Sequence, residues 1–344
     1  MPSALGSGPG AALGLLLAAV GAGQEQEPHH VLPRVETSRV VLEARVTDSR
    51  GRPLPGLGSA DFRLEVDGRR TPVESAVWVA ESPSVARALP SPGAAPAVTT
   101  SPGRLVVLLF QKDFETSPLR GLLRSIRQAK DLVAPFSPRD RVAVLSYDSH
   151  LRLHLDFTAD FDAVRRVLDE SVLLRWPAPI PPGEPPSLAA HLDREEARKA
   201  ASPEQALLAL GRALRPIPGP KTVLFFSWGL GELRGGTFVR HYSYDEARAA
   251  LDAASAAVFC LDVTDAAWHS LELGLQQVAE DTGGQYFKVY ETPGAALAQV
   301  AAALAGHYVV AFERRPEGRR GEHRLRLSLT GRRGTVLTRT RYVD

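Results

Sequence analysis

Residues 104–118, "RLVVLLFQKDFETSP", decide the fold class, because an unbroken apolar run is followed at once by polar residues. The run from Leu105 to Phe110 carries β-branched and aromatic residues, which predicts a strand buried on both faces. In open α/β sheets, ligands bind just beyond the carboxyl ends of such strands. The loop that begins at Gln111 is therefore the first place where the sequence predicts a functional site.

Helix and strand patterns alternate after this first strand. A helix pattern with apolar residues at three- and four-residue spacing follows it, and a hairpin with strands at 142–147 and 151–157 comes next. Further helices and strands alternate as far as residue 305. Such alternation requires a mostly parallel sheet with helices on both faces. The sequence thus predicts a doubly wound, Rossmann-like α/β fold.

The two ends of the chain have a different pattern. Residues 36–80 and 306–344 alternate apolar and polar side chains, and the dipeptide Asp67-Gly68 predicts a hairpin turn. Neither segment has enough strands to be stable alone, so we expect them to pack together as one small β unit. The predicted organisation is a signal peptide at 1–23, an N-terminal β segment at 36–80, a Pro/Ala-rich linker at 81–103, an α/β domain at 104–305 with a Pro-rich insertion at 177–201, and a C-terminal β segment at 306–344.

The N-terminal residues predict export. Residues 11–20, "AALGLLLAAV", form an apolar run followed by the small residues Gly21, Ala22 and Gly23. Ten apolar residues are too few to span a bilayer but fit a secretory signal. A disordered start is the alternative interpretation. Elsewhere no stretch approaches about 18 apolar residues, so the sequence predicts no membrane span and a secreted or periplasmic location.

Composition excludes several classes of partner. The chain has 41 basic and 39 acidic residues, a net charge of +2, which favours neither nucleic acid nor an anionic membrane as a ligand. Its single cysteine, Cys260, lies in the apolar run "AAVFCLDV" and cannot form an internal disulfide. A buried structural thiol is the expectation there, because a nucleophile needs exposure and a neighbouring base.

Several segments resemble one bacterial family. They are "VVLEARVTDSRGRPLPGLGSADFRLEVDGRR", "SPRDRVAVLSYDSHLRLHLDFTAD", "AEDTGGQYF" and the closing "HRLRLSL…TRTRY". In order and spacing they resemble the secreted VWFA-related proteins of the type first defined in Acidobacteria, which carry a von Willebrand factor type A domain. The resemblance covers most of residues 36–344 apart from the linker and the insertion. It implies one antiparallel edge strand, here Leu151–Phe157, and a role in protein binding rather than in chemistry.

The resemblance also implies where a metal ion would lie. Type A domains hold a divalent cation, typically Mg²⁺, with Asp-x-Ser-x-Ser after the first strand, a Thr in a second loop and an Asp after the fourth strand. Here the first motif is absent, Trp228 replaces the last Asp, and Lys112 adds a positive charge, so we expect a degenerate site and no cofactor. The alternative is a weak Mg²⁺ site rebuilt from Asp113, Glu115 and Thr158.

Without the metal, the same edge is predicted to bind protein. Gln111, Phe114 and Trp228 follow the first and fourth strands, and exposed aromatic residues are common anchors in protein interfaces. The alternative is that Phe114 and Trp228 pack on each other as local core. The partner's identity cannot be read from the sequence.

Other motifs give weaker signals for chemistry. The Gly-rich residues 229–236 do not follow the first strand or open onto a helix, so we expect a flexible loop rather than a phosphate site. Asp148, Ser149 and His150 are consecutive, so their side chains are not expected to align as a catalytic triad. Asp262 and Asp265 could be ligands, although turn and capping roles are more usual.

These observations predict a non-enzymatic, exported module for protein interaction or adhesion. Two alternatives remain open at this point. One is a hydrolase or nucleotide-binding enzyme on a Rossmann-like sheet, which would rest on fold class alone. The other is a structural protein of the cell envelope that uses the β unit for assembly.

Overall fold

The structure, a computed structural model, describes residues 39–81, 98–100, 103–113, 116–134, 136–170, 172–173, 175–314 and 320–344. The predicted signal peptide and most of the predicted linker lie outside these residues. Within them, no helix has both the length and the apolar character that a membrane crossing requires.

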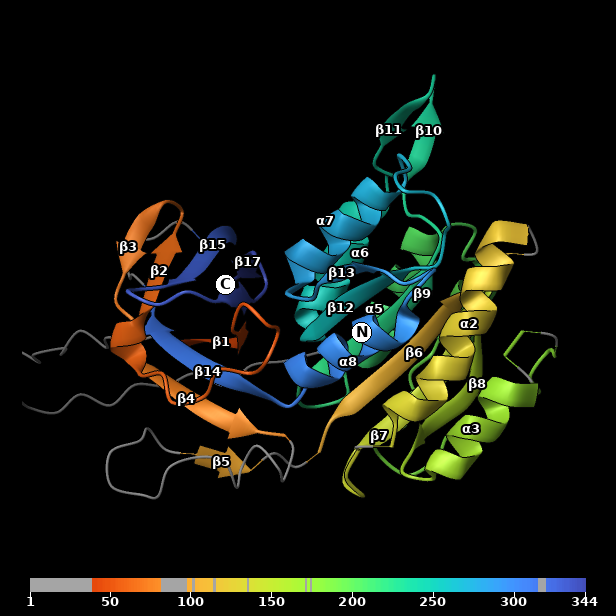
Figure 1. The fold of residues 1–344 in the computed structure, drawn as a ribbon, viewed down its shortest axis with the longest axis horizontal. Coiled ribbons are helices and arrows are strands. Elements are labelled where there is room, and N and C mark those ends of the chain that lie inside the picture. The colour runs from red at the N-terminus through yellow and green to blue at the C-terminus, as the bar shows by residue number, and fades with distance from the viewer. Residues whose placement is uncertain are drawn as a thin grey trace, which may run out of the picture. The chain divides into compact units, whose positions relative to one another are not determined.

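A six-stranded sheet contains the strand predicted at the start of the α/β region (Figure 1). Its strands, in spatial order, are β13 (Tyr286–Lys288), β12 (Ala256–Asp262), β9 (Lys221–Ser227), β6 (Leu105–Gln111), β7 (Arg141–Tyr147) and β8 (Leu151–Thr158). All neighbours pair in parallel except β7 and β8, which are antiparallel. The mostly parallel sheet and its antiparallel edge strand are therefore confirmed.

Helices cover both faces of this sheet, and each strand contributes alternate residues to two cores. One core, which includes Leu108 and Phe110, is closed by α2 (Thr116–Leu132), α3 (Phe161–Glu170) and α8 (Pro293–Ala303). The other, which includes Val107 and Leu109, is closed by α4 (Arg194–Lys199), α5 (Pro203–Leu214), α6 (Tyr244–Ala253) and α7 (Glu272–Thr282). Because both faces are covered, the four named residues of β6 are each 0% exposed.

Local sequence determines where these helices begin. Ser202 accepts a hydrogen bond from the backbone N–H of Gln205 at 3.2 Å, and Pro203 is the first helical residue of α5. A hydroxyl at this position satisfies an N–H that has no partner inside the helix, and proline lacks an N–H to satisfy. Ser202 therefore caps the start of α5.

Strands from both ends of the chain share two further sheets. In Figure 1 the orange N-terminal strands lie among the dark blue C-terminal ones. One sheet has the order β16 (Thr335–Leu337), β1 (Arg39–Thr47), β14 (Gly306–Glu313), β4 (Ser75–Ala80) and β5 (Val98–Thr100). The other has the order β17 (Arg341–Val343), β15 (Glu322–Leu329), β2 (Phe62–Val66) and β3 (Arg69–Thr71), with a short 3₁₀ turn, η1 (Ser59–Asp61), before β2.

Aromatic side chains fill the core between these two sheets. The ring of Tyr308 packs edge-on against Phe62 and Trp78, with centroids 5.3 and 4.8 Å away, and its hydroxyl donates to the carbonyl oxygen of Leu54 at 2.8 Å. Gly306 leaves room for the indole, because a Cβ at that position would lie 2.2 Å from Trp78 Cζ2. Strands from 39–80 and 306–343 thus build one core together.

Candidate functional site

Polar side chains line the carboxyl edge of the six-stranded sheet. Across the register, Lys288 pairs with Asp262, Asp262 with Ser227, and Gln111 with Tyr147. The Ser227 hydroxyl is hydrogen-bonded to the amide of Gln111, which joins β9 to β6. Since β6 is the first strand and lies between β7 and β9, this is also the point where the strand order reverses, the usual ligand position in such sheets.

The residues expected to rebuild a magnesium site do not converge. Asp113 follows β6 at the carboxyl edge, whereas Thr158 ends the antiparallel strand β8 and pairs with Val142 at the opposite end of the sheet. Val142 precedes Tyr147 by five residues, which is about 17 Å along a strand at about 3.3 Å per residue. The prediction of Thr158 as a magnesium ligand together with Asp113 is therefore wrong. Glu115 lies outside the described residues.

Thr158 has a local role instead. Its hydroxyl accepts a hydrogen bond from the backbone N–H of Asp160 at 3.0 Å, in the turn before α3. Threonine often stabilises turns in this way, because its short side chain reaches a backbone group two residues on.

A fixed positive charge lies at the end of β6. Lys112 is buried, and its ammonium group lies 3.2 Å from Asp148, which also accepts a hydrogen bond from Arg152. Burial alone would raise the pKa of Asp148, but hydrogen bonds from Arg152, the backbone of Ser149 and Lys112 bring the pKa well below its usual range. Asp148 thus remains ionised, and it forms ion pairs with both Lys112 and Arg152 at this part of the edge.

Two of the three residues expected to form a protein-binding surface, Gln111 and Trp228, pack into the protein instead. Gln111 is only 2% exposed, so it is not part of a surface. In the orientation that satisfies its amide, it donates to the carbonyl oxygen of Gly229 at 3.1 Å and accepts from Trp228 Nε1 at 3.2 Å. Trp228 is half-buried and packs against the core beneath α2 and α8. Phe114 lies outside the described residues.

The Gly-rich segment also differs from the expected flexible loop. Residues 229–236 lead into a two-stranded hairpin, β10 (Glu232–Arg234) and β11 (Thr237–Val239). No helix begins at these glycines, so the arrangement lacks the helix N-terminus that a phosphate loop needs. Nor do residues 148–150 form a triad: Ser149 Oγ lies 2.8 Å from His150 Nδ1, but the Asp148 carboxylate contacts Lys112, Arg152 and Ser149 rather than the imidazole.

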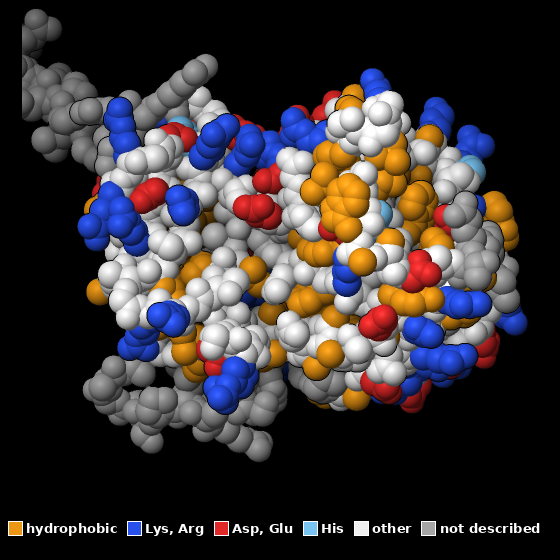
Figure 2. Space-filling view, turned by 45° about the horizontal axis from the view of Figure 1, so that its top comes forward, with side chains coloured by type: hydrophobic (Ala, Val, Ile, Leu, Met, Phe, Trp, Pro, Cys, Tyr) orange, Lys and Arg blue, Asp and Glu red, His pale blue; other side chains and the backbone are white. Residues whose placement is uncertain are grey.

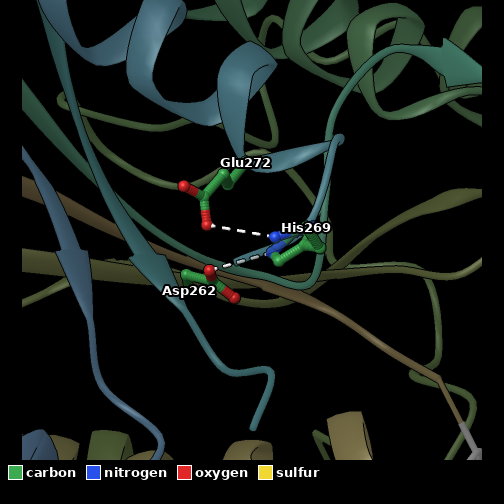
Figure 3. Close-up of side chains that lie close together, drawn as sticks. All are labelled: Asp262, His269 and Glu272. Carbon is green, nitrogen blue, oxygen red and sulfur yellow. Dashed lines mark hydrogen bonds and ion pairs between the residues drawn. The ribbon is translucent and has the colours of Figure 1, made fainter. Parts of the chain in front are cut away.

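A cluster of ionisable side chains lies next to Ser227, at the end of β12 (Figure 3). Asp262 is the last residue of β12, His269 lies in the following loop, and Glu272 is the first residue of α7. His269 Nε2 is 3.0 Å from Asp262 Oδ2, and the His269 backbone N–H donates to Glu272 Oε2 at 3.4 Å. The three side chains offer ligand atoms within 4.8 Å of one another.

Two side chains from β13 complete this cluster. The hydroxyl of Tyr286 donates to Asp262 Oδ2 at 2.6 Å, and Lys288 Nζ lies 2.8 Å from Glu272 Oε2 and 3.8 Å from Asp262 Oδ2. Burial and the hydrogen bond to Asp262 raise the pKa of Tyr286, so its hydroxyl stays protonated and remains a donor. The ammonium group thus lies near both carboxylates and offsets part of their negative charge.

The cluster has the residues of a metal site or of an acid–base pair, but its contacts fit a structural role. Within the described residues, the imidazole of His269 is hydrogen-bonded to Asp262, and no serine or cysteine nucleophile is hydrogen-bonded to this imidazole. Cys260 is fully buried two residues earlier, and burial raises the pKa of its thiol. We call residues 262, 269, 272, 286 and 288 the β12 clasp, because they fasten the loop after β12 to α7 and β13.

Sequence reasoning identified only one member of the β12 clasp. Asp262 was expected to serve either as a ligand or in a turn, and its Oδ1 does accept hydrogen bonds from the backbone and hydroxyl of Thr264 at 3.0 and 2.8 Å. His269 and Glu272 lie seven and ten residues further on, a spacing that matches no single-helix metal motif. A short strand supplies the remaining two members, so only the fold brings them together.

Because Lys288 supplies a positive charge to the clasp, we expect added divalent cations to have little effect. Millimolar Mg²⁺, Mn²⁺ or Ca²⁺ should leave the Tm of chelator-treated protein within about 1 °C of its starting value, since a cation that binds only the folded state would raise it. Differential scanning calorimetry measures this. A rise of several degrees that Asp262→Asn abolishes, while Asp113→Asn does not, would instead identify the clasp as a metal site.

Large apolar side chains are exposed on the segments next to the clasp. Trp268 precedes His269 and is 64% exposed, Leu273 follows Glu272 and is 41% exposed, and Leu233 in the hairpin is 54% exposed. Figure 2, which turns the hairpin end toward the viewer, shows hydrophobic side chains gathered on this part of the molecule. We call Leu233, Trp268 and Leu273 the apolar rim.

The segments that carry the apolar rim are packed closely at their bases. The backbone N–H of Leu230 donates to the carbonyl oxygen of Leu271 at 3.3 Å. Gly274 permits this approach, because a Cβ there would lie 2.2 Å from the carbonyl oxygen of Leu230. The hairpin and the start of α7 therefore leave the sheet as neighbours.

Comparison with solved structures gives distant similarities. No protein-family model and no curated protein matches the chain. An aerotolerance-related membrane protein from Bacteroides fragilis is 13% identical with a TM-score of 0.37, over 59% of this chain and 98% of that one. BatB from Bacteroides thetaiotaomicron is 14% identical with a TM-score of 0.39, over 59% and 97%. Proximal thread matrix protein 1 of the mussel byssus is 12% identical with a TM-score of 0.37, over 59% and 48%.

Proposed function

We propose that the chain is an exported protein-binding module of the von Willebrand factor type A class, which acts by recognition and not by catalysis. Its binding face is the apolar rim of Leu233, Trp268 and Leu273. The observation that carries this proposal is the exposure of three large apolar side chains at the ligand-binding edge of the sheet.

The topology of the sheet supports the type A class. In the order of the chain, the first strand, β6, lies at the centre, the second and third, β7 and β8, extend to one side, and β9, β12 and β13 extend to the other. The third strand is the antiparallel edge, as the resemblance implies. The family-like segments "SPRDRVAVLSYDSHLRLHLDFTAD" and "AEDTGGQYF" contain β7, β8 and the start of β13.

The chemistry of the edge favours recognition. Exposed tryptophan contributes a large contact area and is over-represented among residues that dominate binding energy in protein interfaces. The β12 clasp holds the residues on both sides of Trp268 in place, through His269 and the backbone of Thr264. A binding face that is already ordered loses less entropy when a partner binds.

Replacement of the apolar rim tests this proposal. Full-length protein, bound to an affinity resin, is exposed to an extract of the source organism, and the captured proteins are quantified by mass spectrometry. Any specific partner is then purified and its Kd measured. We expect the double variant Leu233→Ala/Trp268→Ala to bind that partner at least tenfold more weakly, because truncation of an anchor residue typically costs about 2 kcal/mol.

A tryptophan elsewhere on the surface provides the matched control. Trp176 is 77% exposed beside β8, far along the chain from the rim, and Trp176→Ala should leave the Kd unchanged. A partner that binds the double variant and the wild type equally would contradict the proposed face. Turnover of a substrate by the purified chain, lost on a change at the carboxyl edge, would contradict recognition as the function.

A further inference from the structure

A second site lies beside the start of β8, at the opposite side of the sheet from β12 and its clasp. A cavity of about 230 Å³ that opens to solvent is lined by residues 150–153, the Pro-rich segment 176–180 and one face of α4. Much of its wall is apolar, and the side chains that form this wall include Leu151, Leu153, Trp176, Ile180 and Leu192. An apolar cavity with a few convergent polar groups is the usual form of a small-molecule site.

The polar groups that line this cavity are all basic. They are His150, Arg152, Arg194 and Arg198, and no aspartate or glutamate lies among its described lining residues. Helix α4 has arginines on the face that lines the cavity and glutamates on another face. Arg194 and Arg198 are four residues apart and face the cavity, whereas Glu195 and Glu196 line a different hollow.

Two of the three arginines form no ion pair within the part of the chain that the structure describes. Arg152 is buried, stacks on Trp176 with its guanidinium carbon 3.7 Å from the ring centroid, and pairs with Asp148, so its charge is compensated. Arg194 donates only to the carbonyl oxygen of Ile180, at 3.4 Å. Within the described residues, no ion pair involves Arg194 or Arg198. The cavity therefore carries an excess of positive charge beside an apolar wall.

We propose that this cavity binds a small organic anion, a carboxylate carried on an aromatic body. Two guanidinium groups four residues apart on one helix suit a carboxylate, since arginine pairs with it through two parallel hydrogen bonds. The apolar wall beside Trp176 accommodates the ring. The volume is adequate, because a cavity of about 150 Å³ is large enough for benzene. This inference does not depend on the proposed function of the apolar rim.

A matched pair of ligands tests the inference. The probes are 2-naphthoate and its neutral analogue 2-naphthamide, which have nearly the same shape and differ in charge. Titration of the full chain is followed by saturation-transfer NMR and by tryptophan fluorescence. We expect 2-naphthoate to bind with a Kd below about 1 mM and the amide to bind at least tenfold more weakly, since only the acid can pair with arginine.

Charge removal at the cavity distinguishes specific binding from general affinity for aromatic molecules. Arg194→Gln/Arg198→Gln alters two exposed side chains and should weaken 2-naphthoate at least tenfold, with an unchanged circular dichroism spectrum. Arg234→Gln in the hairpin is the control, and it should bind like the wild type. Equal affinity for acid and amide, unchanged affinity in the arginine double variant, or no binding by about 5 mM would each overturn the proposal.

Discussion

Replacement of Lys288 by methionine should lower the free energy of unfolding by about 3 kcal/mol at pH 8. Its ammonium group lies 2.8 Å from Glu272 and 3.8 Å from Asp262, and these carboxylates are 5% and 0% exposed. Methionine keeps most of the aliphatic stem but removes the charge, which leaves two negative groups beside each other away from water. Loss of one partner from a buried pair typically costs about 3–5 kcal/mol. Lys288 is partly exposed, so we expect the lower end of that range.

Two comparison variants show whether charge is the cause. Lys199→Met removes a lysine whose pairing with Glu195 is fully on the surface, and it should change stability by less than about 0.5 kcal/mol. Glu272→Gln in the Lys288→Met background removes one of the two repelling charges and should recover at least half of the loss. Urea unfolding measures all three. Equal losses in the single and double variants would mean that packing of the lysine stem, and not its charge, stabilises the clasp.

Acid should destabilise the protein through His154 by about 3 kcal/mol between pH 6.5 and pH 4. Burial, together with the charges of Lys112 and Arg152, lowers the pKa of His154 from 6.5 to about 4. In the unfolded chain this imidazole takes up a proton below pH 6.5, whereas in the folded chain it stays neutral until about pH 4. The unfolded state therefore binds more protons in this range, so stability falls as pH falls.

The effect of His154 is isolated by comparing variants over one pH series. His154→Gln keeps a polar group near Ser146, whose hydroxyl lies 2.8 Å from His154 Nε2, but cannot titrate. Its stability should fall by about 3 kcal/mol less than that of the wild type between pH 7 and pH 4. Burial raises the pKa of Asp252 to about 7, which acts in the opposite direction but is common to both proteins. His191→Gln, at an exposed position, is the control, and parallel curves for His154→Gln and wild type would contradict the prediction.

The six-stranded sheet could be predicted from the sequence because its signals are local. Leu105–Phe110 is apolar at every position, as a strand covered on both faces must be, and the helices that follow repeat apolar residues with helical spacing. The Asp67-Gly68 turn is likewise local, since both residues adopt positive φ, at 50° and 75°. Each of these features depends on neighbours within a few residues.

The candidate sites could not be predicted in the same way. Thr158 matched a motif in the sequence, but the antiparallel direction of β8 places it at the end of the sheet opposite Asp113. Gln111 ends β6 and Trp228 follows β9, and the hydrogen bond between their side chains makes them part of the local packing at this edge. A motif indicates which residues are available, whereas strand direction and packing decide which of them meet.

The sequence by itself determined the class of the fold, the alternation of strands and helices, the caps and the turns, because propensity and hydrophobic periodicity act over short stretches of chain. Only the tertiary structure decided which polar residues share a site. Asp262, Glu272 and Lys288 come from a strand, a helix and another strand. The ammonium group of Lys288 meets both carboxylates only because the register of β12 and β13 places it beside them. Arg194 and Arg198 likewise face an apolar wall only because α4 packs against β8.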